Sequence, residues 1–454
     1  MVHEPDPHDA PLPVEPIDRL VGPLERFMHV EAAGGIVLLV CTGVALALAN
    51  SPLGDAYHHF WETEIGFHAG RLALRHSLEH WINDGLMALF FFVVGLEVKR
   101  ELVLGELRDP RRAALPVVAA LGGMLAPAGI YLALQGGGPA ARGWGIPMAT
   151  DIAFVVGCMA VLGPRVPAGL RITILSLAIA DDIGAILVIA IGYSAGIHGV
   201  PLALGIGGIA LVLALQRLGV RSFGVYTIAG ILLWLACMHS GIHATLAGVV
   251  LGLLTPARPY LGTTALGDFL ARAAARLHGD PGERAADRVA RMRTLRRVVR
   301  ETVSPLEHLE STLHPWVGFV IMPIFALANA GIAFRPADAT DPVALAVAAG
   351  LCVGKPLGIV GLSWLAVRTG LARLPEGVSW AALAGGGALA GIGFTMALFI
   401  AGLALDGPAR EVAKVGVLGG SAVAALAGMS VLLLALPATG GDSRVHRTGT
   451  STSA

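Results

Sequence analysis

Residues 172–193, which read ITILSLAIADDIGAILVIAIGY, place two adjacent aspartates in the middle of an otherwise apolar run. A bilayer core about 30 Å thick needs about 20 apolar residues to be crossed as a helix, so this run predicts a membrane-spanning helix. Asp181 and Asp182 would then lie near half depth, where insertion costs roughly 2.5 to 3.5 kcal/mol for each aspartate. Carboxylates placed at this depth indicate a functional site.

The whole chain has the composition of a polytopic membrane protein. Its 454 residues are 55% hydrophobic and only 14% charged, and the mean hydropathy is +0.71. This is too apolar for a soluble protein of this length. We expect an all-α membrane protein with twelve transmembrane helices, near residues 32–50, 78–98, 113–134, 144–162, 170–194, 200–216, 223–238, 241–254, 315–333, 343–367, 379–405 and 412–437.

The distribution of lysine and arginine predicts how these helices are oriented. If the N-terminus and the even-numbered loops share one side of the membrane, that side holds 25 of the 32 basic residues, and the other side holds six. The positive-inside rule therefore places both termini in the cytoplasm. The first 31 residues are acidic and rich in proline, which is unlike a cleaved signal peptide.

One long polar segment divides the predicted helices into two groups. Its second half, ERAADRVARMRTLRRVVRETV, predicts a basic amphipathic helix that lies on the cytoplasmic surface against anionic lipid headgroups. Its mixed charge and the neighbouring spans argue against nucleic-acid binding. The predicted organisation is a cytoplasmic N-terminal tail (1–31), helices 1–8 (32–254), an arginine-rich cytoplasmic loop (255–310), helices 9–12 (311–437) and a cytoplasmic polar tail (438–454).

Two of the predicted spans contain helix-breaking residues. The fourth carries Pro147 beside the polar Thr150 and Asp151, and the eleventh has five glycines between 385 and 393. Backbone that leaves the helix at membrane depth is tolerated only inside protein or beside a water-filled cavity. The interruptions occupy comparable positions in spans three to five and ten to twelve, the pattern of inverted repeats around a site at the midplane. Tight helix packing through glycine is the alternative explanation.

Four charged residues lie deep in apolar spans: Asp151, Asp181, Asp182 and Lys355. They come from three different spans and can meet only if those spans surround one cavity. Two neighbouring carboxylates in a medium of low dielectric constant do not ionise together easily, so protons and a cation would compete for the same oxygens. A site loaded by one or the other, and opened alternately to each side, exchanges a cation for protons without covalent chemistry. A purely structural network of charges is the alternative.

Several motifs extend this reading to most of the chain. They are WINDGLMALFFFVVGLEVKREL (81–102), ATDIAFVVG (149–157), LAIADDIGAI (177–186), HSGIHATLAGV (239–249), LHPWVGF (313–319), GKPLGI (354–359), LPEG (374–377) and GIGFTMALFIA (391–401). In this order they resemble the NhaA-type sodium/proton antiporters, from about residue 28 to residue 437.

The resemblance implies a fold and an activity. The fold has twelve helices with inverted repeats, in which the interrupted fourth and eleventh helices cross. The activity is a pH-regulated, electrogenic exchange that exports Na⁺, and also Li⁺, for a larger number of imported protons, in sodium and pH homeostasis. Such a protein is not an enzyme and holds no cofactor. It lies in the bacterial inner membrane, and a homodimer is a further expectation.

The resemblance also implies roles for individual residues. Asp182 would be the main cation and proton site, with Asp181 as its partner and Thr150 as a supporting ligand. Lys355 would pair with Asp181, and Asp151 and Lys355 would balance the dipole ends of the broken helices. The residues associated with regulation by pH are Glu97, Arg100, Glu101, Glu310 and His314. The chain departs from the family in its longer basic loop and in Ser311, which replaces a common histidine.

Two other classes of membrane protein would also use buried acidic residues. An intramembrane aspartyl protease would have one aspartate on each of two helices and a G-x-G-D motif, whereas this chain has an adjacent pair and no such motif. A cation channel would conduct sodium without coupling to protons. His239 and His243 have the spacing of a helical metal pair, but no third ligand follows, so packing or hydrogen bonding is the favoured role.

Overall fold

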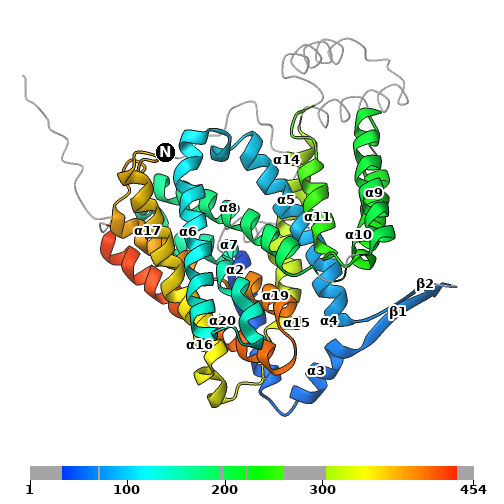
Figure 1. Ribbon diagram of the computed structural model, residues 1–454, viewed down its shortest axis with the longest axis horizontal. Helices are drawn as coiled ribbons and strands as arrows, with labels where there is room; N and C mark the ends of the chain where they lie inside the picture. Colours follow the sequence, from blue (N-terminus) through cyan, green and yellow to red (C-terminus); the bar gives the residue numbers. More distant parts are fainter. Residues whose placement is uncertain are drawn as a thin grey trace, which may run out of the picture.

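The computed structural model describes residues 33–69, 72–194, 196, 198–220, 222–259 and 303–436. The predicted N-terminal tail, most of the arginine-rich loop and the predicted C-terminal tail lie outside these residues. The described part is a bundle of helices from which a β-hairpin projects (Figure 1).

Helices form almost all of the described elements. The first half contains α2 (Ala33–Ala49), α3 (Gly54–Glu62), strands β1 (Glu64–Ala69) and β2 (Leu72–Ser77), α4 (Leu78–His80), the π-helix η1 (Trp81–Leu86), α5 (Met87–Val103), η2 (Glu106–Arg108), α6 (Pro110–Gln135), the 3₁₀-helix η3 (Pro139–Met148), α7 (Ile152–Leu162), η4 (Gly163–Arg165), α8 (Ala168–Gly192), α9 (Gly199–Arg217), α10 (Phe223–Ser240) and α11 (Thr245–Leu254). The second half contains α14 (Pro305–Trp316), η5 (Val317–Ile321), α15 (Met322–Asn329), η6 (Pro336–Thr340), α16 (Pro342–Ala349), η7 (Gly350–Gly354), α17 (Lys355–Arg368), α18 (Trp380–Ala390), α19 (Phe394–Ala404) and α20 (Gly407–Ala435).

The lengths and hydropathies of these helices are those of a multi-pass membrane protein. Within the described ranges, nine helices or joined helices are long and apolar enough to cross a bilayer, and up to eleven if each bent pair forms one span. The region predicted as the eighth span, 241–254, contains only the ten-residue α11, which is below this length. The class predicted from the sequence is confirmed, and the number twelve stays a prediction.

The two ends of the bundle differ in charge. We call the end where α5 is followed by α6 the basic end, and the opposite end, from which β1 and β2 project, the hairpin end (Figure 1). Arginines follow or end four helices at the basic end: Arg108 after α5, Arg165 after α7, Arg217 in α9 and Arg368 in α17. The positive-inside rule uses this unequal distribution of arginine to predict which end of the bundle faces the cytoplasm.

Both predicted interruptions are present. In the fourth predicted span, η3 ends at Met148, and the backbone is extended at Ala149 and Asp151 before α7 begins. In the eleventh, α18 and α19 are separated by residues 391–393 and bent by 47°. The amide of Asp151 donates to the carbonyl oxygen of Ile392 at 2.7 Å, so the two interruptions touch each other.

One helix begins before the ninth span that the sequence predicts. The arginine-rich loop was predicted to extend to 310 and the ninth span to begin at 315, but α14 begins at Pro305. A reciprocal capping box starts it there, because the Ser304 hydroxyl accepts from the Glu307 amide and the Glu307 carboxylate accepts from the Ser304 amide. A helix can begin outside the bilayer, so the loop and span boundaries predicted at 310 and 315 stay predictions.

The β-hairpin is an element that the all-α prediction did not contain. β1 and β2 pair antiparallel, with Glu64 opposite Ser77, and Arg75 Nε lies 2.6 Å from Glu64 Oε2. The strands are six residues each and lie between apolar spans, so a search for long apolar runs passes over them.

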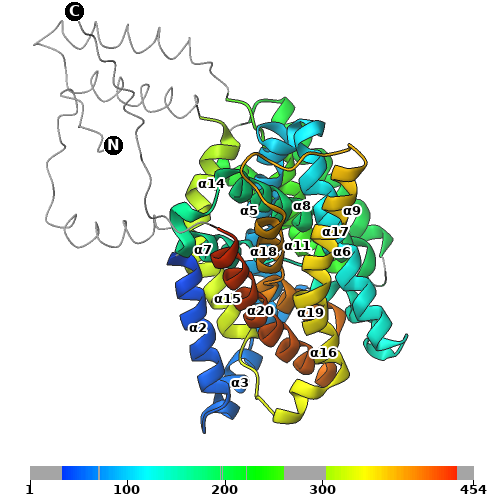
Figure 2. The ribbon, with the colours of Figure 1, turned by 90° about the vertical axis from the view of Figure 1, so that its left-hand side faces the viewer.

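Glycines bring two pairs of helices into backbone contact. α6 lies beside α17 (Figures 1 and 2), and a Cβ added to either Gly122 or Gly358 would overlap the carbonyl oxygen of the other. α5 meets α11 in the same way, since a Cβ on Gly95 would lie 2.6 Å from the carbonyl oxygen of Val249. Small residues that allow such approach are the usual means of helix association in membranes.

Candidate functional site

A buried ion pair joins α8 to α17 at the centre of the bundle. Lys355 Nζ lies 2.7 Å from Asp181 Oδ2, and the Thr150 hydroxyl donates to the same oxygen at 2.7 Å. All three side chains are at most 1% exposed. The Lys355 ammonium group therefore balances the charge of Asp181, and the Thr150 hydroxyl adds a hydrogen bond, both from segments that are far apart in the sequence.

Asp182 lies beside this pair with a different environment. Its side chain is 4% exposed, and no hydrogen-bond partner among the described residues reaches Oδ1. Asp181 Oδ1 likewise lacks a partner there. Buried polar oxygens are nearly always satisfied in folded proteins, so these two oxygens could receive a cation or a proton. Carboxylate oxygens suit hard cations such as Na⁺.

Asp151 lies where the two interrupted helices meet. It is the N-cap residue of α7, with Oδ1 accepting from the Phe154 amide at 3.3 Å. Oδ2 accepts from the hydroxyl of Thr395 and, at 3.2 Å, from its amide in the first turn of α19. One carboxylate thus meets the positive N-terminal ends of both α7 and α19.

Donors meet the opposite ends of the broken helices. Lys355 Nζ donates to the carbonyl oxygen of Met148, the last residue of η3. The Thr150 hydroxyl lies 2.9 Å from the carbonyl oxygen of Ala390, the last residue of α18. Lys355 therefore satisfies a carbonyl group that the first interruption leaves without a helical partner, and the Thr150 hydroxyl, which has one proton to share between Asp181 and Ala390, lies at the end of α18.

The predicted regulatory residues form contacts between α5 and α14, toward the basic end. Arg100 Nη1 lies 2.5 Å from Glu310 Oε1, and His314 Nδ1 lies 3.4 Å from Glu97 Oε1. The histidine pair is an ion pair only when the imidazole is protonated. Four of the five residues associated with pH regulation are thus placed in two pairs across one helix interface.

Glu101 faces a different neighbour. Its side chain is buried, and Oε1 accepts from the Ser176 hydroxyl at 3.1 Å and from the Glu106 amide at 2.9 Å. Ser176 lies on α8, six residues before Asp182. Glu101 therefore connects the basic end of α5 to the helix that carries the central aspartates.

Two further residues of the site were not singled out from the sequence. Thr395 binds Asp151, and the Ser421 hydroxyl accepts from the Phe394 amide at 3.0 Å, at the first residue of α19. Thr395 lies within the motif GIGFTMALFIA (391–401), which the sequence analysis includes without naming this residue. Ser421 lies in an apolar stretch of α20 where a serine gives no signal of its own.

The histidine pair His239 and His243 does not converge on one point. His239 Nδ1 lies 2.9 Å from the carbonyl oxygen of Leu235, and His243 Nε2 lies 3.0 Å from that of Tyr193. In the part of the chain that the structure describes, no three His, Cys, Asp or Glu side chains are grouped to hold a metal ion. These contacts agree with the hydrogen-bonding role.

Comparison with known proteins covers nearly the whole chain. The family model described as Na⁺/H⁺ antiporter 1 matches residues 25–432. The Na⁺/H⁺ antiporter NhaA of Rhodopirellula baltica is 55% identical over 427 residues, which cover 94% of this chain and 97% of that protein. NhaA of Rhizobium meliloti is 53% identical over 425 residues (93% and 97%), and NhaA 2 of Acidiphilium cryptum is 50% identical over 444 residues (97% and 98%).

Proposed function

Because the chain belongs to the Na⁺/H⁺ antiporter family of NhaA-type proteins, we propose that it exports Na⁺, and Li⁺ as well, in exchange for a larger number of imported protons. The family consists of transporters, and the proposed cycle needs no covalent chemistry and no cofactor. Its role would be sodium and pH homeostasis. The observation that carries the proposal is the buried carboxylate of Asp182, one oxygen of which has no partner among the described residues, beside Asp181 paired with Lys355.

Competition for the same oxygens would couple the two ions. A cation that binds Asp182 and the free oxygen of Asp181 needs those oxygens to be unprotonated, and protons that bind there displace the cation. Thr150 already donates to Asp181 and lies within the same group of atoms, which supports its role as an additional ligand. A site that opens to one side at a time then exchanges the ions instead of conducting either.

Lys355 would serve as the internal counter-charge. In the structure its ammonium group binds Asp181 Oδ2, and a cation at the aspartates would repel it and compete for the same carboxylate. Release of Lys355 from Asp181 would compensate for the positive charge that arrives. The contacts of Asp151 and Lys355 with the broken helices support their role of balancing the helix ends.

We further propose the topology and surroundings that the sequence predicts. These are twelve spans as inverted repeats with crossing fourth and eleventh helices, both termini in the cytoplasm, and a bacterial inner-membrane location. A homodimer and a loop that contacts anionic lipids, with no nucleic-acid partner, complete the proposal. The basic end would face the cytoplasm and the hairpin end the outside.

The direct test is sodium-triggered proton movement by the wild-type protein. Proteoliposomes with an acidic interior should release protons when sodium is added outside, over a range from about pH 6.5 to about pH 9, within which a histidine loses its charge. Liposomes without protein provide the control. Sodium flux that ignores the proton gradient would favour a channel, and the absence of flux from folded protein would contradict sodium transport.

The pairs between α5 and α14 predict a change in the pH profile. The Glu97–His314 attraction exists only while the imidazole is protonated. His314→Ala should therefore alter the rate of exchange at the acid end of the profile and leave the rate at about pH 9 closer to that of the wild type. Glu310→Gln, which breaks the pair with Arg100, should also move the profile more than the maximum rate.

The controls for this prediction come from the same helix. His308 lies on α14, is exposed, and has no ion pair among the described residues, so His308→Ala should leave the profile unchanged. His314→Gln keeps a hydrogen-bonding side chain but cannot become charged. If His314→Gln and His314→Ala both reproduce the wild-type profile, His314 has no part in the regulation.

A further inference from the structure

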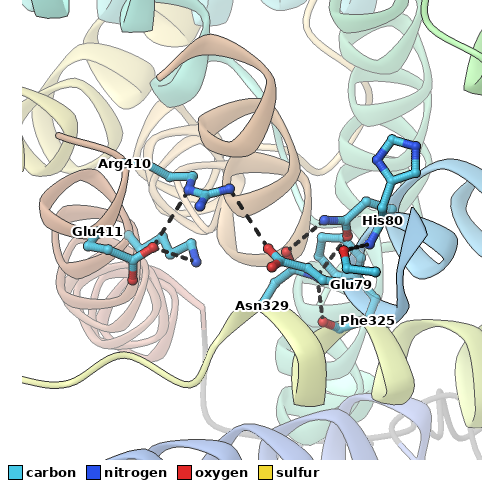
Figure 3. A network of polar contacts seen from close by, with 9 residues as sticks. Glu79, His80, Phe325, Asn329, Arg410 and Glu411 are labelled. Carbon is cyan, nitrogen blue, oxygen red and sulfur yellow. Dashed lines mark hydrogen bonds and ion pairs between the residues drawn. The ribbon is translucent and has the colours of Figure 1, made fainter. Parts of the chain in front are cut away.

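A network of four charged residues lies at the hairpin end (Figure 3). Arg410 Nη1 lies 3.8 Å from Glu79 Oε1, and Arg410 Nε lies 3.7 Å from Glu411 Oε1. Lys414 Nζ lies 3.0 Å from the same oxygen of Glu411. We call Glu79, Arg410, Glu411 and Lys414 the outer network. Its two positive and two negative charges balance.

The outer network connects two different parts of the bundle. Arg410, Glu411 and Lys414 lie in the first turns of α20, whereas Glu79 lies in α4, which is continuous with η1 and α5. Only the Arg410–Glu79 contact crosses between the two helices, because the others lie within α20.

A second polar contact lies behind the network. Asn83 Nδ2 donates to Asn329 Oδ1 at 3.2 Å, and Asn329 Nδ2 donates back to Asn83 Oδ1 at 2.8 Å. Asn329 is buried and also donates to the carbonyl oxygen of Phe325. Asn83 lies one turn beyond Glu79 in the same continuous helix, so the amide pair lies next to the outer network, and Figure 3 shows Asn329 near Glu79.

Glycine contacts show which helices belong together. α20 is fixed to the helices around the site, since a Cβ on Gly416 would lie 2.5 Å from the carbonyl oxygen of Ala344 in α16, and a Cβ on Gly428 would overlap Leu389 of α18. α5 has its own backbone contact with α11. The outer network therefore bridges a close-packed group that carries the site and a neighbour that does not.

The same span has a polar bridge at its other end. Glu101 of α5 accepts from Ser176 of α8 toward the basic end. The residues 78–103 are thus tied to the helices of the site at both ends, with the aspartates between. If the site opens to one side at a time, at least one of these two polar contacts must break during the cycle.

We propose that the ion pair between Glu79 and Arg410 is a latch: it holds the outer side of the transport site closed, and it breaks whenever the site opens outward. This inference rests on the proposed function. The contact is long, and its side chains are 25% and 34% exposed, so it is weak enough to break in each cycle. When it parts, Arg410 keeps Glu411 as a partner, and Lys414 holds Glu411 in place.

Chemical labelling of a cysteine introduced at position 329 tests the latch without measuring transport. In a protein whose four native cysteines are replaced, Asn329→Cys would be exposed to a membrane-impermeant thiol reagent added at the outer side. Arg410→Gln and Glu79→Gln should each speed the labelling by about two- to fivefold, the factor expected for a weak, partly exposed ion pair. The double variant should label no faster than the singles, because both break one contact.

The control variant is Arg335→Gln. Arg335 is an exposed arginine at the hairpin end with no ion pair among the residues that the structure describes, and its loss should not change the labelling. Labelling of the Arg410→Gln protein at the parent rate would overturn the latch.

A cleavable cross-link provides the functional arm of the test. Cysteines at positions 79 and 410, joined by a short reducible linker, should stop exchange, and reductant should restore it. Full exchange by the cross-linked protein would overturn the latch. Absence of exchange before cross-linking and in the wild type would instead contradict the proposed function, and the labelling experiment would then decide the latch alone.

Discussion

Replacing Asp182 by asparagine is expected to abolish sodium-dependent proton movement while the protein remains folded in the membrane. The amide has nearly the volume of the carboxylate, but it carries no charge and neither takes up nor releases a proton in a titration near neutral pH. Asp182 is buried, and its Oδ1 lacks a partner among the described residues, so the substitution breaks no contact to that oxygen. The rate of proton release should fall by about 100-fold or more, to that of liposomes without protein.

Asp181→Asn is the matched comparison for this result. Asp181 binds both Lys355 and Thr150, so its replacement should lower thermal stability as well as transport. Asp182→Asn should lower transport with little change in the melting temperature of the purified protein. Sodium-dependent proton release by Asp182→Asn at the wild-type rate would remove Asp182 from the transport site.

Replacing Lys355 by alanine is expected to damage both stability and transport. Lys355 is fully buried, and its loss leaves Asp181 without its counter-charge. Breaking one partner out of a buried ion pair typically costs about 3 to 5 kcal/mol, less whatever is recovered when the remaining carboxylate takes up a proton. Lys355→Arg keeps the positive charge and should retain part of the activity, although the guanidinium must fit a closely packed space beside Gly123.

A double variant separates the two effects. Because Asp181→Asn removes the charge that Lys355→Ala leaves unpaired, the combination should melt at a higher temperature than Lys355→Ala alone. Thermal unfolding in detergent and initial rates of proton release in proteoliposomes provide the measurements. Equal stability of Lys355→Ala and the wild type, together with equal transport rates, would show that the pair has no role.

Much of the architecture could be predicted from the sequence. Composition and apolar runs predicted a multi-pass membrane protein, and the bias of arginine toward alternate loops predicted its orientation. Pro147 and the glycines between 385 and 393 predicted the two interruptions, which the structure contains. These features are local or additive along the chain, since hydropathy, helix breaking and charge bias are properties of short segments.

Other features could not be predicted this way. The start of α14 at Pro305 and the β-hairpin depended on short-range signals that a search for apolar runs overlooks. A capping box of Ser304 and Glu307 starts α14 within the polar segment, ten residues before the predicted span.

The sequence by itself determined the class of protein, its apolar segments and the charged residues that lie deep within them. The Lys355–Asp181 pair was expected only from the resemblance to a family, and the tertiary structure supplies the contact itself. The tertiary structure alone brings Asp151 to Thr395 and Arg410 to Glu79, pairs that are more than 170 residues apart. Such contacts depend on how whole helices pack, and no periodicity within one segment records its partner in another.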